Sequence, residues 1–148
     1  MSFFKHKSDP HTTYGIYHQI DASISNYIMY LVESKDGLTN WQDVRKIDLF
    51  ASQGKAWLNP NGEDIVIAYE QSNATWGGNS VRLLHYKNLA ELREGHIAEQ
   101  LDLPKSLVKE CCEGTPSFEG FERWNGDLKS SKFFMRFHYL SKDRYDHD

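Results

Sequence analysis

The segments Val66-Ile-Ala-Tyr-Glu-Gln71 and Val81-Arg-Leu-Leu-His-Tyr86 are short runs of β-branched, aliphatic and aromatic residues. Runs of this kind, bounded by turn residues, are typical of strands in an antiparallel sheet. Between them lies Trp76-Gly77-Gly78-Asn79, whose glycines favour a turn. The two segments therefore predict neighbouring strands.

Similar runs recur on both sides of this pair. They are Thr13–Gln19, Tyr27–Glu33, Val44–Leu49, Lys55–Leu58, Ala98–Leu101, Thr115–Phe118 and Phe133–Tyr139. Helical signals are short: Leu89–Glu94 and Lys105–Cys111 each suit one helical turn, and Gly95 and Pro104 interrupt anything longer. We expect an all-β chain of antiparallel strands with a short helical turn near residues 105–111.

Three strands repeat a common pattern, an apolar run that ends in an aromatic residue and polar residues. Tyr14-Gly-Ile-Tyr-His-Gln19 matches Val66-Ile-Ala-Tyr-Glu-Gln71 closely, and Met135-Arg-Phe-His-Tyr139 matches loosely. A repeat of roughly fifty residues with up to four strands is typical of β-propeller blades. We predict one partial propeller domain over residues 1–148, with blades at 13–50 and 54–103 and a partial blade at 113–140. An ordinary β-rich α+β domain is the alternative.

One predicted turn has a recognisable composition. Ser34-Lys-Asp-Gly-Leu-Thr-Asn-Trp41 resembles the aspartate-box turn of sialidases, and also the corresponding turn of the five-bladed propeller glycosidases of the arabinanase and xylosidase type. In such a turn Asp36 bonds backbone amides, Gly37 takes a positive φ and Trp41 packs between sheets. The resemblance bears on fold and has almost no bearing on chemistry.

A second segment carries the chemical expectation. Glu113-Gly-Thr-Pro116 resembles the Glu-Gly-Pro segment that opens the inner strand of the third blade in those glycosidases, with Thr115 inserted before the proline. The resemblance implies that Glu113 is the general acid. Glycoside hydrolysis needs a second carboxylate, and the weak candidates are Asp9, as the base ahead of the first predicted strand, and Glu70, at a strand end. The second inner strand, Gly54–Asn59, contains no carboxylate.

A sugar-binding site is easier to assemble from this sequence than a catalytic one. Sugars dock on aromatic faces while polar groups read their hydroxyls. The candidates are Trp57, Lys55, Tyr69 and His138. Sheet-to-sheet packing is the competing interpretation of the Trp and Tyr, and a core or rim position that of the His.

Other classes of function have little support. Cys111 and Cys112 are adjacent and are the only cysteines, and the seven His residues show no metal-ligand spacing, so we expect no metal and no cofactor. A net charge of −4 argues against nucleic acid, and no apolar run is long enough for a membrane partner. The first twenty residues lack the apolar core of a secretory signal, so the expected location is the cytoplasm, unless the chain is a fragment of a longer secreted protein.

The length of 148 residues is small for the predicted fold. A closed propeller has at least four blades, so the open edges predict a homo-oligomer or edge-strand association. Two functions stay open. One is a carbohydrate-active propeller that binds or hydrolyses an oligo- or polysaccharide, and the other is a non-catalytic propeller fragment for protein interaction or self-assembly.

Overall fold

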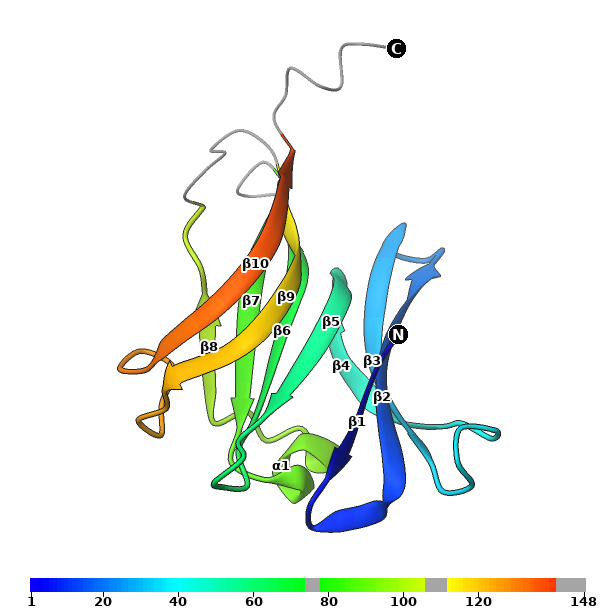
Figure 1. The fold of residues 1–148 in the computed structure, drawn as a ribbon. Coiled ribbons are helices and arrows are strands. Elements are labelled where there is room, and N and C mark those ends of the chain that lie inside the picture. Colours follow the sequence, from blue (N-terminus) through cyan, green and yellow to red (C-terminus); the bar gives the residue numbers. More distant parts are fainter. Residues whose placement is uncertain (74–77, 106–111, 141–148) are drawn as a thin grey trace.

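The computed structural model describes residues 1–73, 78–105 and 112–140. Two four-stranded antiparallel sheets and a two-stranded hairpin account for nearly all of its regular structure (Figure 1). Sheet one has the order β1 (Ser2–His6), β2 (Asp9–Asp21), β3 (Asn26–Ser34) and β4 (Gln42–Leu49). Sheet two has the order β5 (Ala51–Leu58), β6 (Ile65–Asn73), β7 (Gly78–Tyr86) and β8 (Glu99–Asp102). The hairpin joins β9 (Cys112–Arg123) to β10 (Lys132–Leu140).

The all-β prediction is confirmed, and nine of the ten strands within the described residues contain or overlap the runs predicted from the sequence. The strand that the sequence did not reveal is β1, which pairs with β2 through Ser2, Phe3 and Phe4 before its register shifts. It has only five residues and ends on Lys5 and His6, too short for a clear alternation. The arrangement is compatible with blades of a propeller, and the ring itself stays a prediction.

One of the two predicted helical turns lies within the described part of the chain. Helix α1 (Leu89–Glu94) forms at one of the two predicted places, where the Asn88 side chain accepts a hydrogen bond from Glu91 N and Gly95 ends the helix at φ 86°. Of the turn predicted near 105–111, residues 106–111 lie outside the described residues. None of the helical structure in the described ranges is long and apolar enough to cross a membrane.

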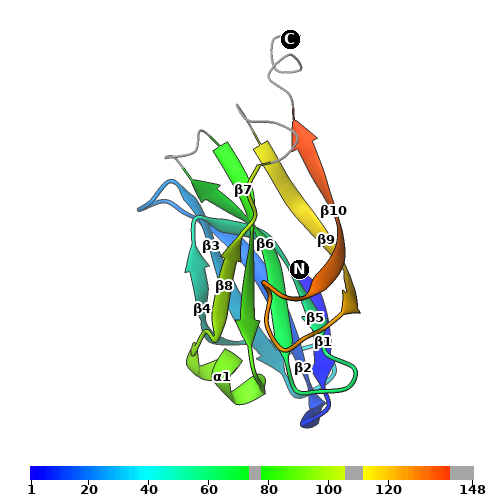
Figure 2. The same ribbon diagram turned by 90° about the vertical axis from the view of Figure 1, so that its left-hand side faces the viewer.

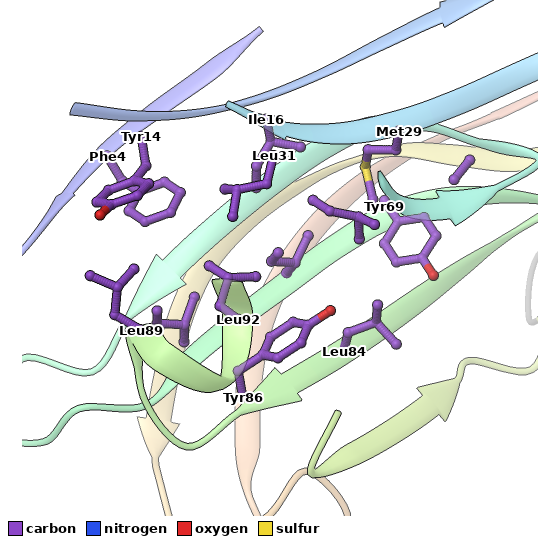
Figure 3. Packing of buried hydrophobic residues seen from close by; sticks show 14 residues of the cluster. Phe4, Tyr14, Ile16, Met29, Leu31, Tyr69, Leu84, Tyr86, Leu89 and Leu92 are labelled. Atoms are coloured by element: carbon purple, nitrogen blue, oxygen red, sulfur yellow. The ribbon is translucent and has the colours of Figure 1, made fainter. Parts of the chain in front are cut away.

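Sheets one and two pack face to face around the larger core. Figure 3 shows Ile16 and Leu31 from sheet one above Leu84 and Tyr86 from sheet two, with Leu92 of α1 beside Tyr86. These side chains are at most 1% exposed. Because side chains alternate across a strand, the opposite face of sheet two is left for the hairpin to cover.

The hairpin covers that second face (Figure 2). Phe118 and Leu128 are buried there against Val66, Ala68 and Leu83 of sheet two. The molecule is thus a stack of three β layers, each covering the next.

The turn between β3 and β4 has the expected geometry. Asp36 Oδ1 accepts hydrogen bonds from Asn40 N at 3.0 Å, Thr39 N at 3.3 Å and Ser34 Oγ at 2.8 Å. These bonds, that of the Asn40 amide first, lower the pKa of Asp36 to about 2. Gly37 and Leu38 both have positive φ, 77° and 86°. The Asp36 carboxylate therefore holds the turn.

The position expected for Trp41 between the sheets is wrong. Trp41 stacks on Phe3, with ring centroids 5.4 Å apart, and lies over Gly15. Since Tyr14 and Ile16 face the core, Gly15 between them belongs to the other face of β2. Trp41 consequently lies on the outer face of sheet one.

Candidate functional site

The first strands of the three β layers meet around one cavity of about 330 Å³, which we call the inter-sheet cavity. Strand β1 contributes Ser2, β5 contributes Gln53, Gly54 and Lys55, and β9 contributes Thr115 and Pro116; Met1, Ile16 and His18 complete its lining. Most of these groups are polar, so the cavity suits a hydrophilic ligand.

Local backbone irregularities create the cavity wall on β5. Pairing of β5 with β6 is interrupted between Ser52 and Lys55, and Gln53 has a φ of 56°. A bulge of this kind leaves residues outside the ladder and redirects side chains. A Cβ on Gly54 would lie 2.4 Å from Met29 Sδ, so only glycine lets β5 approach sheet one this closely.

Glu70 and the segment that starts at Glu113 meet beside this cavity. Glu70 Oε2 accepts a hydrogen bond from Thr115 N at 2.8 Å, and Asn79 donates to Glu70 Oε1. Thr115 itself has a φ of 51°. A Cβ on Gly114 would lie 2.0 Å from Glu70 Oε2. The carboxylate of β6 therefore fills the space left by the glycine of β9.

Glu113 is 4% exposed and lies at the start of β9 opposite Tyr139 of β10. Its chain neighbours Thr115 and Pro116 line the cavity, whereas Glu113 itself is not one of the lining residues. Sequence reasoning predicted Glu113 and Glu70 separately, and the structure brings their strands together.

His18 is the titratable group on the sheet-one side of the cavity. Its Nδ1 accepts a hydrogen bond from Gln53 N at 3.2 Å. Burial, with the N-terminal amino group, lowers the pKa of His18, and the negative charge of Glu70 acts in the opposite direction. His18 is a residue of the site that the sequence argument missed, although its position within Tyr17-His18-Gln19, aligned with Tyr69-Glu70-Gln71, was the available signal.

Lys55 lies at the inter-sheet cavity, and its role in sugar binding stays a prediction. It lines the cavity, and its Nζ donates to Ser117 Oγ at 3.2 Å. His138 is exposed on β10 opposite Gly114, beside a separate cavity of about 300 Å³ with Thr115, Ser117 and Arg136. Thr115 thus lines both cavities.

Trp57 and Tyr69 lie away from the inter-sheet cavity. The Trp57 ring packs against Phe121 and Trp124, at centroid distances of 4.5 and 5.8 Å, and lines another cavity of about 240 Å³. Tyr69 is fully buried in the core, where its hydroxyl donates to Asp48. Packing between layers is what the structure shows for both aromatic residues.

Asp9 lies far from the other carboxylates. It begins β2 instead of preceding the first strand, and its Oδ2 accepts a hydrogen bond from Tyr14 Oη at 2.8 Å, which lowers the pKa of Asp9. In Figures 1 and 2 the turn between β1 and β2 is at the opposite end of the molecule from the start of β9. Asp9 is therefore too remote to act on a bond held beside Glu113.

No group of three or more His, Cys, Asp or Glu side chains is arranged to hold a metal ion within residues 1–73, 78–105 and 112–140. Of the two cysteines, Cys112 lies within the described residues and Cys111 does not. Comparison of the chain with protein-family models, with curated proteins and with solved structures finds no match.

Proposed function

We propose that the inter-sheet cavity binds a glycan and that Glu70 and Glu113, whose strands meet beside it, are the carboxylates for glycoside hydrolysis. The observation that carries the proposal is the meeting of Glu70 with the Glu113–Thr115 segment beside a polar cavity between the β layers. The resemblance of Glu113-Gly-Thr-Pro116 to the propeller glycosidases supports the same assignment.

The chemistry of the cavity favours sugar over an apolar ligand. Lys55, Gln53 and Thr115 offer an ammonium, an amide and a hydroxyl to ligand hydroxyls. Hydrolysis further requires two carboxyl groups about 5 Å apart for retention of configuration or about 6.5–9.5 Å apart for inversion. Glu113 is our candidate general acid, and Glu70 is its candidate partner.

A screen of arabino-, xylo- and sialo-oligosaccharides tests this function, with calorimetry for binding and reducing-end release for hydrolysis. We expect Glu113→Gln to retain binding and to lose at least a hundredfold in hydrolysis, because the amide cannot donate the acid proton. Glu122→Gln removes an exposed carboxylate of the same strand and is the matched control. Wild-type protein that neither binds nor cleaves any of these sugars excludes the proposal.

A second function, self-assembly through open edges, has its own support. Phe134 on β10 is 62% exposed, and β10 pairs only with β9 in the described part of the chain. An exposed edge strand with apolar side chains can pair with another chain. We expect the wild-type particle to exceed the monomer mass in light scattering and Phe134→Glu to reduce it, and a monomeric wild-type protein contradicts this function.

A further inference from the structure

The outer face of sheet one carries two pairs of stacked aromatic rings. Trp41 and Phe3 stack with an interplanar angle of 23°, and Tyr17 and Tyr30 stack at 18° with centroids 5.3 Å apart. Gly15 lies two residues before Tyr17 on the same strand, and Trp41 lies over it. The two pairs therefore follow one another along β2, separated by about 7 Å, the rise of two strand residues.

Gly15 allows the indole to lie against the sheet. A Cβ at this position would lie 3.2 Å from Trp41 Cζ3 and 3.0 Å from Val32 Cγ2. Phe3 is 52% exposed, although it lies in a sheet whose other face is fully packed. The rings thus form an open aromatic row on the side of sheet one that turns away from sheet two.

A cavity of about 510 Å³ adjoins this row at the turn between β3 and β4. We call it the turn cavity, and it is lined by Glu33, Lys35, Asp36, Asn40, Trp41 and Gln42. Trp41 belongs to both the row and the cavity. The Asp36 hydrogen bonds already described hold the cavity wall, so the wall is preorganised.

Charge in the turn cavity is compensated within the protein. Glu33 is paired with Arg93 and lies 3.6 Å from Lys35 Nζ. The Asp36 carboxylate is occupied by the donors of its own turn. The remaining lining offers the Gln42 amide and the side-chain oxygen of Asn40, whose Nδ2 donates to Asp36, beside an indole. A pocket with an exposed aromatic ring face and a few neutral polar groups suits a neutral sugar better than an ion.

We propose that the aromatic row and the turn cavity form a second carbohydrate-binding site, which takes a neutral polysaccharide chain along β2. Successive sugar residues of the chain stack on the two ring pairs, and the side-chain amides of Asn40 and Gln42 bind the sugar hydroxyls. This site lies on the opposite face of sheet one from the core, so it stands whether or not the inter-sheet cavity hydrolyses anything.

Affinity gel electrophoresis with linear arabinan, arabinoxylan, xyloglucan and mixed-linkage β-glucan tests the site. We expect at least one polysaccharide to retard the wild-type protein. Trp41→Ala and Phe3→Ala each weaken that retardation at least tenfold, and Trp41→Phe retains most of it because a ring remains. Ile97→Ala truncates an exposed apolar side chain outside the row and is expected to leave retardation unchanged.

Lys55→Ala separates the two sites, because it removes a lining group of the inter-sheet cavity, so that binding there weakens, and leaves retardation by the aromatic row unchanged. Circular dichroism verifies folding of each variant, and Phe3→Ala, which truncates a half-exposed side chain, keeps the test decisive if Trp41→Ala unfolds. Retardation by none of the four polysaccharides overturns the proposal, as does equal retardation of wild type and Phe3→Ala. Phe3→Ala could also lower the particle mass without any loss of retardation. That result shows that the outer face of sheet one is a contact between copies of the chain, and it overturns the proposal as well.

Discussion

The carboxylate of Glu70 occupies the place of the side chain that Gly114 lacks, with 2.0 Å between Glu70 Oε2 and a Cβ built on the glycine. The same carboxylate oxygen accepts the Thr115 amide proton. One contact thus joins sheet two to the hairpin at the edge of the candidate site. Loss of this contact is expected to change the free energy of unfolding.

We predict that Gly114→Ala lowers the free energy of unfolding by about 1–3 kcal/mol, because the methyl group displaces Glu70 and breaks its bond to Thr115. Urea unfolding measures the loss. In a Glu70→Ala background the same substitution has room, so the two effects are expected to be strongly non-additive. Additive effects contradict the described contact, and Ser117→Ala on the same strand is the control.

The turn at Asp36 predicts a pH dependence of stability. The pKa of Asp36 is about 2 in the folded protein and 3.8 in the unfolded chain. The ionised carboxylate therefore stabilises the fold above pH 3.8, and this stabilisation is lost as the pH falls toward 2. We expect Asp36→Asn to melt at a lower temperature than wild type at pH 7. The difference narrows below pH 4 and is nearly absent at pH 2. A difference in melting temperature that is constant over this range shows that ionisation of Asp36 does not stabilise the turn.

Two fully buried tyrosines differ in what their hydroxyls bind. Tyr69 donates to Asp48, which also meets Arg82 at 3.2 Å. The Tyr86 hydroxyl has no hydrogen-bond partner within the described residues, and burial raises its pKa, with Arg45 acting in the opposite direction. We predict that Tyr69→Phe costs about 1.5–3 kcal/mol of unfolding free energy and that Tyr86→Phe is nearly neutral. Equal losses in thermal or urea unfolding contradict this difference.

Substitution of Trp57 distinguishes a role in packing between the β layers from a role in sugar binding. It contacts Phe121 and Trp124 of the hairpin, so we predict that Trp57→Ala costs about 2–4 kcal/mol and increases amide exchange in β9 and β10. Glycan affinity at the inter-sheet cavity is expected to stay within twofold, as measured by calorimetry on the folded fraction. A large loss of glycan affinity with an unchanged free energy of unfolding shows that Trp57 binds sugar and contradicts this prediction.

The strand content was predictable because period-2 alternation and turn residues are local signals, as in Ile65–Asn73 and Gly78–Tyr86. Strand β1 was not, since five residues with a register shift carry too little pattern. The approach of Glu70 to Gly114 depends on how the hairpin crosses sheet two, and no spacing in the chain encodes that crossing. His18 was missed for the same reason, because its role comes from Gln53 of another sheet.

Phe50 is the single residue between β4 and β5, with a φ of 54°. Its carbonyl accepts the Ser72 amide proton at 2.8 Å, and Gln71 Nε2 donates to the carbonyl of Leu49 at 3.2 Å. Both bonds hold the corner between sheet one and sheet two to β6. If the inter-sheet cavity binds the proposed glycan, we expect little entropic cost from movement of sheet one relative to sheet two.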